Sequence, residues 1–236
     1  MNGKIDCLRI IGILVMATLL VAGMSGPARA SDAMDARHLV EKATITLNDF
    51  DKAKDMSAFR DLLKDAKGVF ISPQILKGAF VVGASGGSGV FMVRDATTGE
   101  WSQPAFYTIG AASFGLQIGG EASEVVLLAM TDRGVSALLS DSVKLGADVG
   151  VAAGPVGVGA AASTANLSAD ILSFARSKGL FAGISLDGAV VKVRDSLNDA
   201  YYNATVTPTD ILVKRTVMNR HSERLISAIS TDAAKG

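Results

Sequence analysis

The sequence predicts an α+β protein in which a glycine-rich antiparallel β-sheet or barrel-like body is flanked by N- and C-terminal helices. Residues 68–188 hold 20 of the 25 glycines, and short β-like runs alternate there with turn residues. Residues 28–66 hold no glycine, and apolar residues recur there at helical spacing. Apolar residues make up 49% of the chain but aromatic residues only 6%, so we expect closely approaching strands and not a core built on large rings.

The first 30 residues have the pattern of a secretory signal peptide. Lys4 and Arg9 precede an uncharged run over residues 10–24, and Ala28-Arg29-Ala30 supplies a small-x-small cleavage site. The run of about 15 residues is shorter than the roughly 20 that a membrane-spanning helix needs, so an uncleaved anchor is the alternative that we weigh less. We expect cleavage after Ala30 and a periplasmic or secreted protein. Cys7 lies in this leader, and the mature chain then has no cysteine for a disulfide or a metal site.

Helices are predicted over residues 32–65, directly after the leader. One helix covers residues 32–54, and a second covers residues 57–65, where Phe59, Leu62 and Leu63 form an apolar face. The apolar stripe of the first helix consists of Leu39, Val40, Ala43, Leu47 and Phe50.

The β-rich body is predicted over residues 68–194. Ser85-Gly86-Gly87-Ser88 is interpreted as a hairpin turn, Lys77 is placed in a turn after Pro73, and Thr131 is expected to cap a helix that ends at residue 139. The small residues of 144–160 are expected where a backbone approaches closely or where a wall lines a cavity. Strands are expected at residues 68–71, 79–84, 90–94, 105–109, 114–118, 125–130 and 190–193.

The C-terminal part is predicted to be helical again. A helix is expected over residues 195–202, and Pro208 is expected to open a helical turn that ends at residue 213. The tail over residues 214–236 has helical composition, and we interpret it as the solvated flank of a packed helix, with a membrane-surface helix as the alternative.

Charge and residue types argue against nucleic-acid binding and against most catalysis. Lys plus Arg and Asp plus Glu both number 23, so no overall positive charge attracts a nucleic acid. The two histidines, His38 and His221, lie in the flanking helices and not in the glycine-rich body, where a metal site or a catalytic triad would need them. We therefore expect no catalytic residues, no metal and no cofactor.

Three weaker motifs are interpreted structurally. Gly83-Ala84-Ser85-Gly86-Gly87 matches a nucleophile elbow, but that motif needs a strand that leads into a helix, and another strand is expected here. Residues 157–162 match a dinucleotide fingerprint without the surrounding strand and helix. Glu121 and Glu124 are interpreted as solvated carboxylates.

Several ordered blocks resemble the SYLF domain family. The resemblance runs from about Ala36 to Leu212, and we assign residues 31–213 to the domain. Its blocks are Ala66-Lys67-Gly68-Val69 before Pro73, Pro104 to Tyr107, Ser113 to Gly120, Lys144 to Gly157, Ser177 to Gly183 and Tyr201-Tyr202.

The resemblance implies a lipid-binding module. Eukaryotic relatives bind phosphoinositides, and fungal ones bundle actin; their SYLF domain usually occurs beside an SH3 or FYVE domain. In bacterial relatives the SYLF domain follows an export signal and has no such neighbouring domain. Because this chain has the second arrangement, we expect phospholipid or a membrane surface as its partner, and actin is not an expected partner in that compartment.

The candidate lipid-binding residues follow from the same resemblance. Lys67, Lys77, Arg94 and Lys178 are candidates for contact with lipid phosphate, provided that the fold brings them to one face. An N-terminal amphipathic helix takes part in lipid binding by eukaryotic relatives, and the matching residues are Phe59, Leu62, Leu63 and Lys64. The alternative, which the shortness of the apolar face favours, is that this helix simply covers the sheet.

Two functional hypotheses result. The first is an exported, non-catalytic phospholipid-binding protein in which a basic rim recognises phosphate beside an apolar face. The second is an envelope structural or interaction module whose sheet mediates self-association, as a homo-oligomer, or association with a partner. A hydrolase that uses Ser85 comes third.

Overall fold

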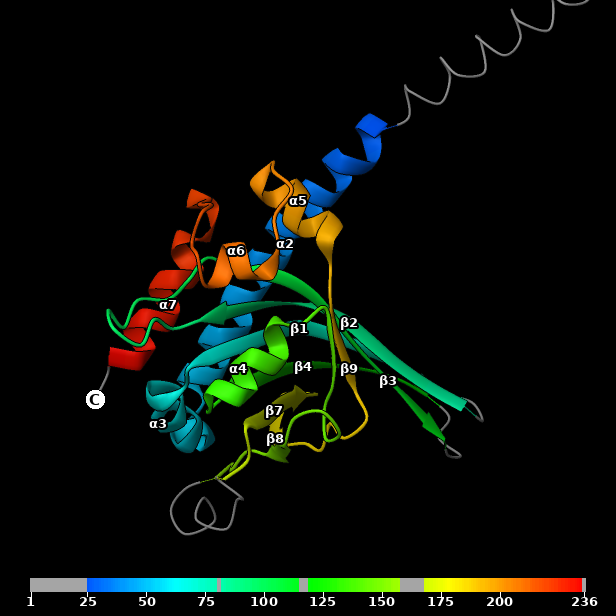
Figure 1. The fold of residues 1–236 in the computed structure, drawn as a ribbon. Coiled ribbons are helices and arrows are strands. Elements are labelled where there is room, and N and C mark those ends of the chain that lie inside the picture. Colours follow the sequence, from blue (N-terminus) through cyan, green and yellow to red (C-terminus); the bar gives the residue numbers. More distant parts are fainter. Residues whose placement is uncertain (1–24, 80–81, 115–118, 158–167, 235–236) are drawn as a thin grey trace, which may run out of the picture.

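The structure, a computed structural model, describes residues 25–79, 82–114, 119–157 and 168–234. Its central feature is a nine-stranded sheet that curls into a half-barrel, with helices from both ends of the chain packed against it (Figure 1). This arrangement confirms the predicted α+β class, with a barrel-like sheet and flanking helices.

The strand order is β5-β9-β3-β2-β1-β4-β7-β6, and β8 pairs with the other part of β7. The paired strands run antiparallel to one another, except that β6 runs parallel to β7. The strands are β1 (Gly68–Ala79), β2 (Val82–Val93), β3 (Ala105–Phe114), β4 (Gly119–Ala129), β5 (Ser142–Lys144), β6 (Val151–Ala153), β7 (Ile171–Ser177), β8 (Leu180–Gly183) and β9 (Val190–Val193).

Helices lie on both faces of the sheet. α2, α3, α5 and α7 contribute to a cluster on one face, which we call the outer core, whereas α4 and α6 contribute to a cluster on the other face, the inner core. Strands β5 and β7 are far apart in the sheet, yet both contribute to the inner core, so the sheet curls around it. The helices are α2 (Ser25–Lys52), the 3-10 helix η1 (Lys54–Met56), α3 (Ser57–Asp65), α4 (Asp132–Leu139), α5 (Asp195–Tyr202), α6 (Pro208–Leu212), the 3-10 helix η3 (Arg220–Ser222) and α7 (Glu223–Ala234).

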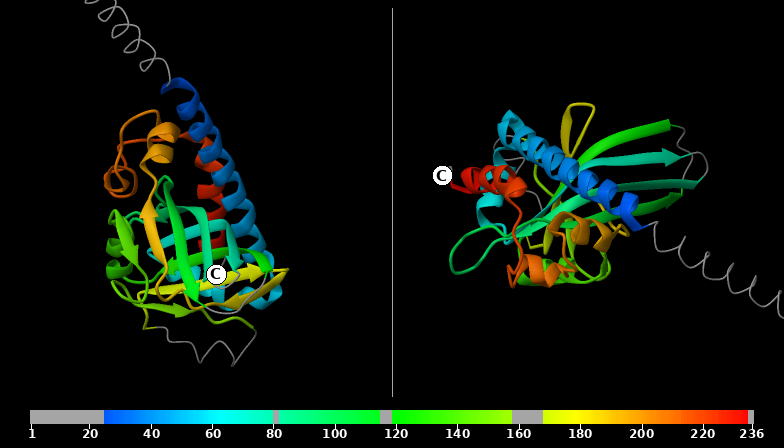
Figure 2. Two further views of the ribbon diagram at one scale, coloured as in Figure 1. Left: turned by 90° about the vertical axis from the view of Figure 1, so that its right-hand side faces the viewer. Right: turned by 90° about the horizontal axis from the view of Figure 1, so that it is seen from above.

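The long helix α2 follows the predicted apolar stripe. Figure 2 shows it lying along the sheet beside α7. The five stripe residues, from Leu39 to Phe50, are at most 8% exposed, which confirms the helical periodicity. The helix ends at Lys52, two residues before the predicted end. Ala30, after which we expect cleavage, is an exposed residue of α2.

Two predicted helix starts are confirmed. The Thr131 hydroxyl accepts a hydrogen bond from the Gly134 N–H at 3.0 Å and begins α4. Thr207 and Asp210 form a reciprocal capping box that begins α6 at Pro208, as the proline predicts.

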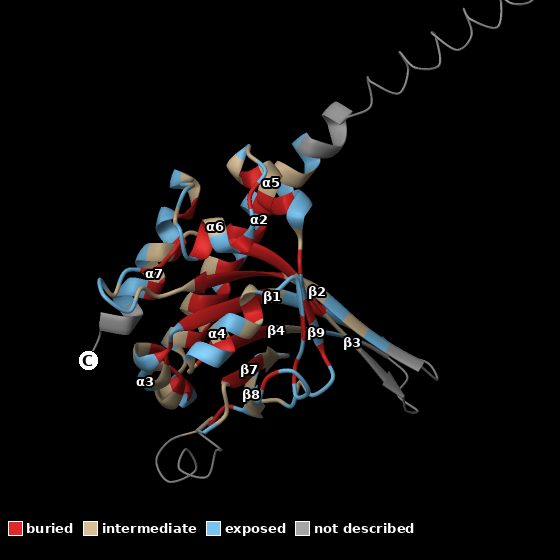
Figure 3. Ribbon diagram, viewed as in Figure 1, coloured by how far each residue is buried: buried red, intermediate tan, exposed pale blue. Residues whose placement is uncertain are grey.

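Strands β1 to β4 project beyond the helices (Figure 3), and here the predicted turns were wrong. Residues 85–88 form no turn: they lie inside β2, because they pair on both sides with β1 and β3. Residues 105–109 and Phe114 belong to the one strand β3 and not to two strands, whereas residues 115–118 lie outside the described residues. Small residues in these strands present little side chain to pack, and both faces of the projecting part are partly exposed.

The C-terminal tail is less helical than its composition predicts. Arg215 has a φ of 55°, a left-handed conformation that interrupts a helix, and its guanidinium donates to the Glu100 carbonyl at 2.9 Å. The α-helix of the tail begins only at Glu223 and packs into the outer core through Leu225 and Ile229. The buried Leu225 and Ile229 agree with a packed helix.

Candidate functional site

A cavity of about 410 Å³ lies at the end of the inner core, where β1 to β4 begin to project. We call it the inner cavity. Pockets that hold small molecules in proteins have volumes of roughly 300–1,000 Å³. Its apolar lining belongs to or packs against the inner core and includes Ile75, Ile109, Val125, Ala175, Ile184 and Leu186.

A bulge in β1 determines which side chains face this cavity. Between Ile71 and Gln74, β1 advances three residues while its partner β2 advances two. Pro73 lies at this point, and proline has no backbone N–H to lose from a sheet ladder. An extra residue inverts the alternation of side chains along a strand. This is why Ile71 packs in the outer core while Ile75 packs in the inner core.

Lys77 is brought to the inner cavity by this inversion. It follows Ile75 by two residues on the same face of β1 and lines the cavity. The prediction that Lys77 lies in a turn after Pro73 was wrong, because β1 continues through the bulge to Ala79.

Gly87 permits the bulge to close. An alanine Cβ at Gly87 would lie 2.1 Å from the Gln74 carbonyl oxygen and 3.1 Å from the Ile75 Cα. Both are main-chain atoms, so a side chain at this position would have to push β1 and β2 apart. Gly87 therefore serves close backbone approach and not a turn.

The rim of the inner cavity is polar and carries both signs of charge. Lys77 on β1 lies opposite Glu121 on β4 in register. The Ser177 hydroxyl donates to the Glu121 carboxylate at 2.5 Å, and the Ser185 hydroxyl donates to the Asp187 carboxylate at 2.5 Å. Glu121 and Asp187 are exposed while the apolar lining is buried or half-buried, so the cavity leads from water into the inner core.

The wall opposite the sheet is the connection between β8 and β9, residues 184–189. The Leu145 N–H donates to the Ala189 carbonyl, and the Gly188 N–H donates to the Leu145 carbonyl, both at 2.8 Å. Leu145 is itself fully buried. The wall is therefore tied to the small-residue segment that the sequence predicted to approach a backbone or line a cavity.

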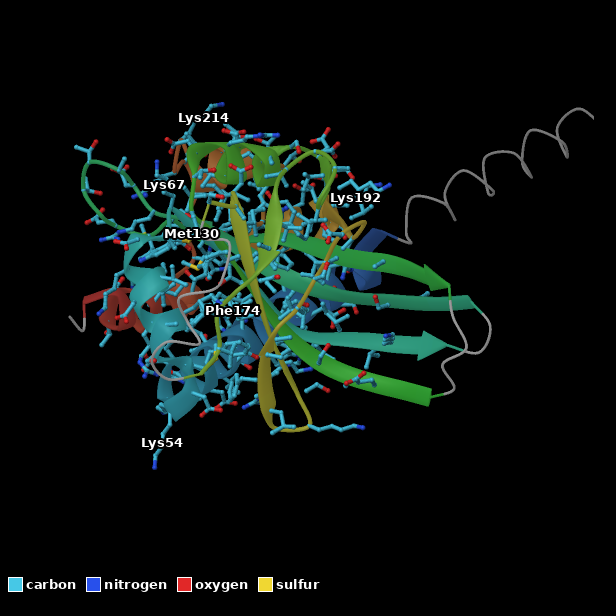
Figure 4. All side chains as sticks on the ribbon, turned by 90° about the horizontal axis from the view of Figure 1, so that it is seen from below. Lys54, Lys67, Met130, Phe174, Lys192 and Lys214 are labelled. Atoms are coloured by element: carbon cyan, nitrogen blue, oxygen red, sulfur yellow. The ribbon has the colours of Figure 1, made fainter. Side chains whose placement is uncertain are left out.

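Lys67 lies far from Lys77. It immediately precedes β1, and ten residues of strand at about 3.3 Å each put roughly 30 Å between the two. In Figure 4, Lys67 lies on the side opposite to the projecting ends of the strands. Its ammonium pairs with Asp132 at 2.7 Å.

Arg94 and Lys178 occupy two further places. Arg94 lines a hollow with Lys67, but its guanidinium donates to the carbonyls of Lys64 at 2.6 Å and Gly99 at 3.2 Å, a structural role. Lys178 is an exposed residue in the turn between β7 and β8, in a left-handed conformation with a φ of 51°. The fold does not bring the four predicted cations to one face.

The predicted amphipathic helix is α3, and its apolar side faces the protein. Phe59 and Leu63 are fully buried in the outer core, and the Phe59 ring lies 5.2 Å from that of Phe174, which is in the interior in Figure 4. Leu62 is half-buried, and Lys64 pairs with the neighbouring Asp61 at 3.1 Å. In this structure the helix covers the sheet, as in the alternative interpretation.

An ion network that the sequence did not predict joins α2 to the sheet. Arg176 of β7 pairs with Asp49 of α2 at 2.8 Å and with Glu124 of β4 at 2.5 Å. The Thr46 hydroxyl donates to the other oxygen of Glu124 at 3.1 Å. Glu124 is thus a half-buried structural carboxylate, and its interpretation as solvated was wrong. The register of β4 with β7 places Glu124 opposite Arg176, and the packing of α2 against the sheet adds Asp49 and Thr46.

The residues considered for catalysis are not assembled into a site. The Ser85 hydroxyl lies in mid-strand and donates to the Ala111 carbonyl at 3.4 Å, without the strand-to-helix turn of a nucleophile elbow. His221 faces Glu41 at 3.2 Å and the Tyr201 hydroxyl at 3.4 Å, while His38 is exposed on α2. Among the residues described, no group of three or more His, Cys, Asp or Glu is placed to hold a metal ion. No helix in the described ranges has the length and apolar character to span a membrane.

Comparison with known proteins identifies a consistent set of relatives. A family model described as "Las17-binding protein actin regulator" matches residues 110–232. Human SH3 domain-containing YSC84-like protein 1 is 32% identical over 176 residues, which cover 74% of this chain and 51% of the human protein. Protein YSC84 of Saccharomyces cerevisiae is 32% identical over 177 residues, covering 73% of this chain and 37% of the yeast protein. The chain therefore spans about half the length of the human relative and about a third of the yeast one.

Proposed function

The chain belongs to the Ysc84 family, the SYLF family that its sequence resembles. From the leader pattern, the resemblance and the inner cavity, we propose that it is an exported, non-catalytic phospholipid-binding protein of the bacterial cell envelope. Membership itself confirms the resemblance seen in the sequence.

The inner cavity is the observation that carries the proposal. Its lining is aliphatic, its rim is polar, and a cation, Lys77, lies where the two meet. An amphiphile such as a phospholipid has the same arrangement of chemistry. An acyl chain gains about 0.8 kcal/mol for each methylene that it buries, and the Lys77 ammonium offers three donors to a phosphate.

The proposed site is smaller than the basic rim that the sequence suggested. Of the four predicted cations, Lys77 alone lines the inner cavity. Contact of Lys67, Arg94 and Lys178 with the surface of a membrane stays a prediction. Insertion of α3 into lipid would require Phe59 and Leu63 to leave the outer core.

Export is proposed from the leader pattern of residues 1–30. If the leader is removed after Ala30, the mature protein begins at Ser31 and contains no cysteine. The intact mass of the protein recovered from its own cell envelope checks this: a chain that begins at Ser31 agrees, and a chain that retains residues 1–30 contradicts the proposal.

Lipid extraction and native mass spectrometry of the same material test the binding. We expect a co-purifying phospholipid at about one per chain. Ala111 lines the inner cavity, whereas Ala122 lines a hollow on the other face of the sheet. Ala111→Phe should therefore lose the lipid, and Ala122→Phe, as the matched control, should keep it. Folded protein without lipid, or loss in the control alone, would contradict the proposal.

Protein association is a second candidate function, favoured by two observations. The family description names Las17 binding. In addition, β9 pairs with β3 only up to Gly110, and β7 pairs with β4 only from Ser123, so the described projecting strands leave two edges open to a further strand. An exported chain would not meet actin, so the partner would be a second copy or another envelope protein. Light scattering tests this: a strict monomer that still carries lipid counts against it.

A further inference from the structure

The rim of the inner cavity is not simply basic. Among its described residues, Lys77 is the one cation, whereas Glu121 and Asp187 are two carboxylates. The other polar members are hydroxyls: Ser85, Ser123, Ser177 and Ser185. An anionic headgroup at this rim would thus meet one attractive and two repulsive charges.

These charges are not paired with one another. Lys77 and Glu121 lie opposite in register on β1 and β4, yet no ion pair within 4.0 Å joins them, and no described cation pairs with Asp187. Each carboxylate accepts one serine hydroxyl and keeps further acceptor positions. The rim therefore offers free donors at Lys77 and free acceptors at the two carboxylates.

The two carboxylates come from different walls. Glu121 is on the sheet, and Asp187 is on the connection between β8 and β9 that closes the other side. A headgroup at the rim lies between them, with Lys77 beside Glu121. Both acidic groups are exposed, so they face the ligand and the solvent and are not buried in the fold.

We propose that the inner cavity selects a phospholipid whose headgroup carries an ammonium as well as a phosphate. This inference rests on the proposed phospholipid binding and specifies the headgroup. The phosphate accepts hydrogen bonds from Lys77 and the serine hydroxyls, and the ammonium donates to Glu121 or Asp187. Charge-assisted hydrogen bonds of both kinds form, and the ammonium offsets part of the repulsion between the phosphate and the two carboxylates. A headgroup with a phosphate and no ammonium leaves both carboxylates without a cationic partner. Such a headgroup therefore binds less tightly.

The acyl chain binds below the headgroup. The apolar residues lie on the buried side of the rim, and a volume of about 410 Å³ suits one chain or part of one. A single-chain phospholipid is therefore a suitable soluble probe for the site.

The test compares lysophospholipids that share one acyl chain and differ in headgroup, each below its critical micelle concentration, by isothermal titration with the full mature chain. We expect lysophosphatidylethanolamine to bind at least tenfold more tightly than lysophosphatidylglycerol. The choline analogue should lie between them, because its quaternary nitrogen donates no hydrogen bond. Free phosphoethanolamine should show no measurable binding, because it lacks the acyl chain.

Variants assign the selectivity to the rim. Glu121→Gln combined with Asp187→Asn should reduce the preference for ethanolamine over glycerol to less than about threefold. Lys77→Gln should weaken the binding of the ethanolamine and glycerol lysophospholipids by a similar factor. Glu100→Gln, an exposed carboxylate whose side chain is 75% accessible and which lies outside the cavity lining, is the matched control and should leave the preference unchanged. Circular dichroism checks that each variant is folded. If the double variant does not fold, the preference is measured with Glu121→Gln and Asp187→Asn separately.

The outcomes separate the two proposals. If no lysophospholipid binds to folded protein, or if free phosphoethanolamine binds as tightly as the lipid, the proposed phospholipid binding is wrong. If the lysophospholipids bind but the glycerol headgroup binds equally or more tightly, or if the double variant keeps the full preference, the two-sign headgroup is overturned while lipid binding stands.

Discussion

Replacing Gly87 with alanine should destabilise the bulge that turns Lys77 toward the inner cavity. The new Cβ would lie 2.1 Å from the Gln74 carbonyl oxygen, 3.0 Å from the carbonyl carbon and 3.1 Å from the Ile75 Cα. All three are backbone atoms of β1, so no side-chain rotation relieves the contact. The strands have to separate at the bulge, which disturbs their hydrogen bonds and the orientation of Lys77.

Overpacking of a tightly packed site costs about 1–3 kcal/mol, and contact with backbone puts this substitution at the upper end. In a chain of this size, each 1 kcal/mol lowers the Tm by roughly 2–4 °C. We therefore expect Gly87→Ala to lose about 2–3 kcal/mol of unfolding free energy, with a Tm lower by roughly 4–12 °C.

Gly86→Ala is the matched control, since it adds the same atom one residue earlier. The nearest atom to its Cβ would be the Ile109 carbonyl oxygen at 3.6 Å, an ordinary contact. Its unfolding free energy should stay within about 0.5 kcal/mol of the wild type. Urea denaturation followed by circular dichroism measures both variants. Equal stability of the two would refute the close approach at Gly87 and with it the account of the bulge.

Three further predictions concern stability. Phe59→Ala should lower the unfolding free energy, measured by urea denaturation, by about 3–5 kcal/mol, because it leaves a cavity at a fully buried site. Leu62→Ala, at a half-buried site, should lower it much less. Equally small effects of the two substitutions would contradict the burial of the apolar side of α3. Hydrogen bonds from Thr207, followed by Lys214, lower the pKa of Asp210 from 3.8 to about 2. The wild type should therefore lose more stability than Asp210→Asn as the pH falls from about 4 to 2, and identical profiles would argue against the capping box. Tyr107→Phe should leave the Tm unchanged or raise it, because the buried hydroxyl has no hydrogen-bond partner among the described residues; a loss above about 1 kcal/mol would indicate a partner.

Local periodicity and capping predicted part of the fold. The spacing of apolar residues in α2 is a property of one helix, and it predicted the buried stripe from Leu39 to Phe50. Thr131 and Pro208 act within a few residues of themselves, so their roles at α4 and α6 were also visible in the sequence.

The errors arose where distant backbone decides the local structure. Glycine and serine at residues 85–88 have turn chemistry, but pairing with β1 and β3 makes them strand. The face of the sheet on which Lys77 lies depends on the one extra residue at the bulge. The alternation of residue types within β1 does not reveal that bulge.

The candidate site was predictable only in part. Of its rim, Lys77 was a candidate from the family resemblance, but Glu121 was taken as merely solvated and Asp187 was not considered. The carboxylates reach the rim through the pairing of β4 with β1 and through the anchoring of residues 184–189 on Leu145. Both are long-range relations that residue types do not reveal.

Photo-cross-linking shows whether a lipid chain occupies the inner cavity. A lysophospholipid with a diazirine at the end of its acyl chain would be irradiated with the mature protein, and the labelled residues mapped by peptide mass spectrometry. We expect labels on the cavity lining, at Ile109, Val125 and Ala175. Labels confined to α3, to α7 or to the exposed Leu76 on the other face of β1 would contradict it.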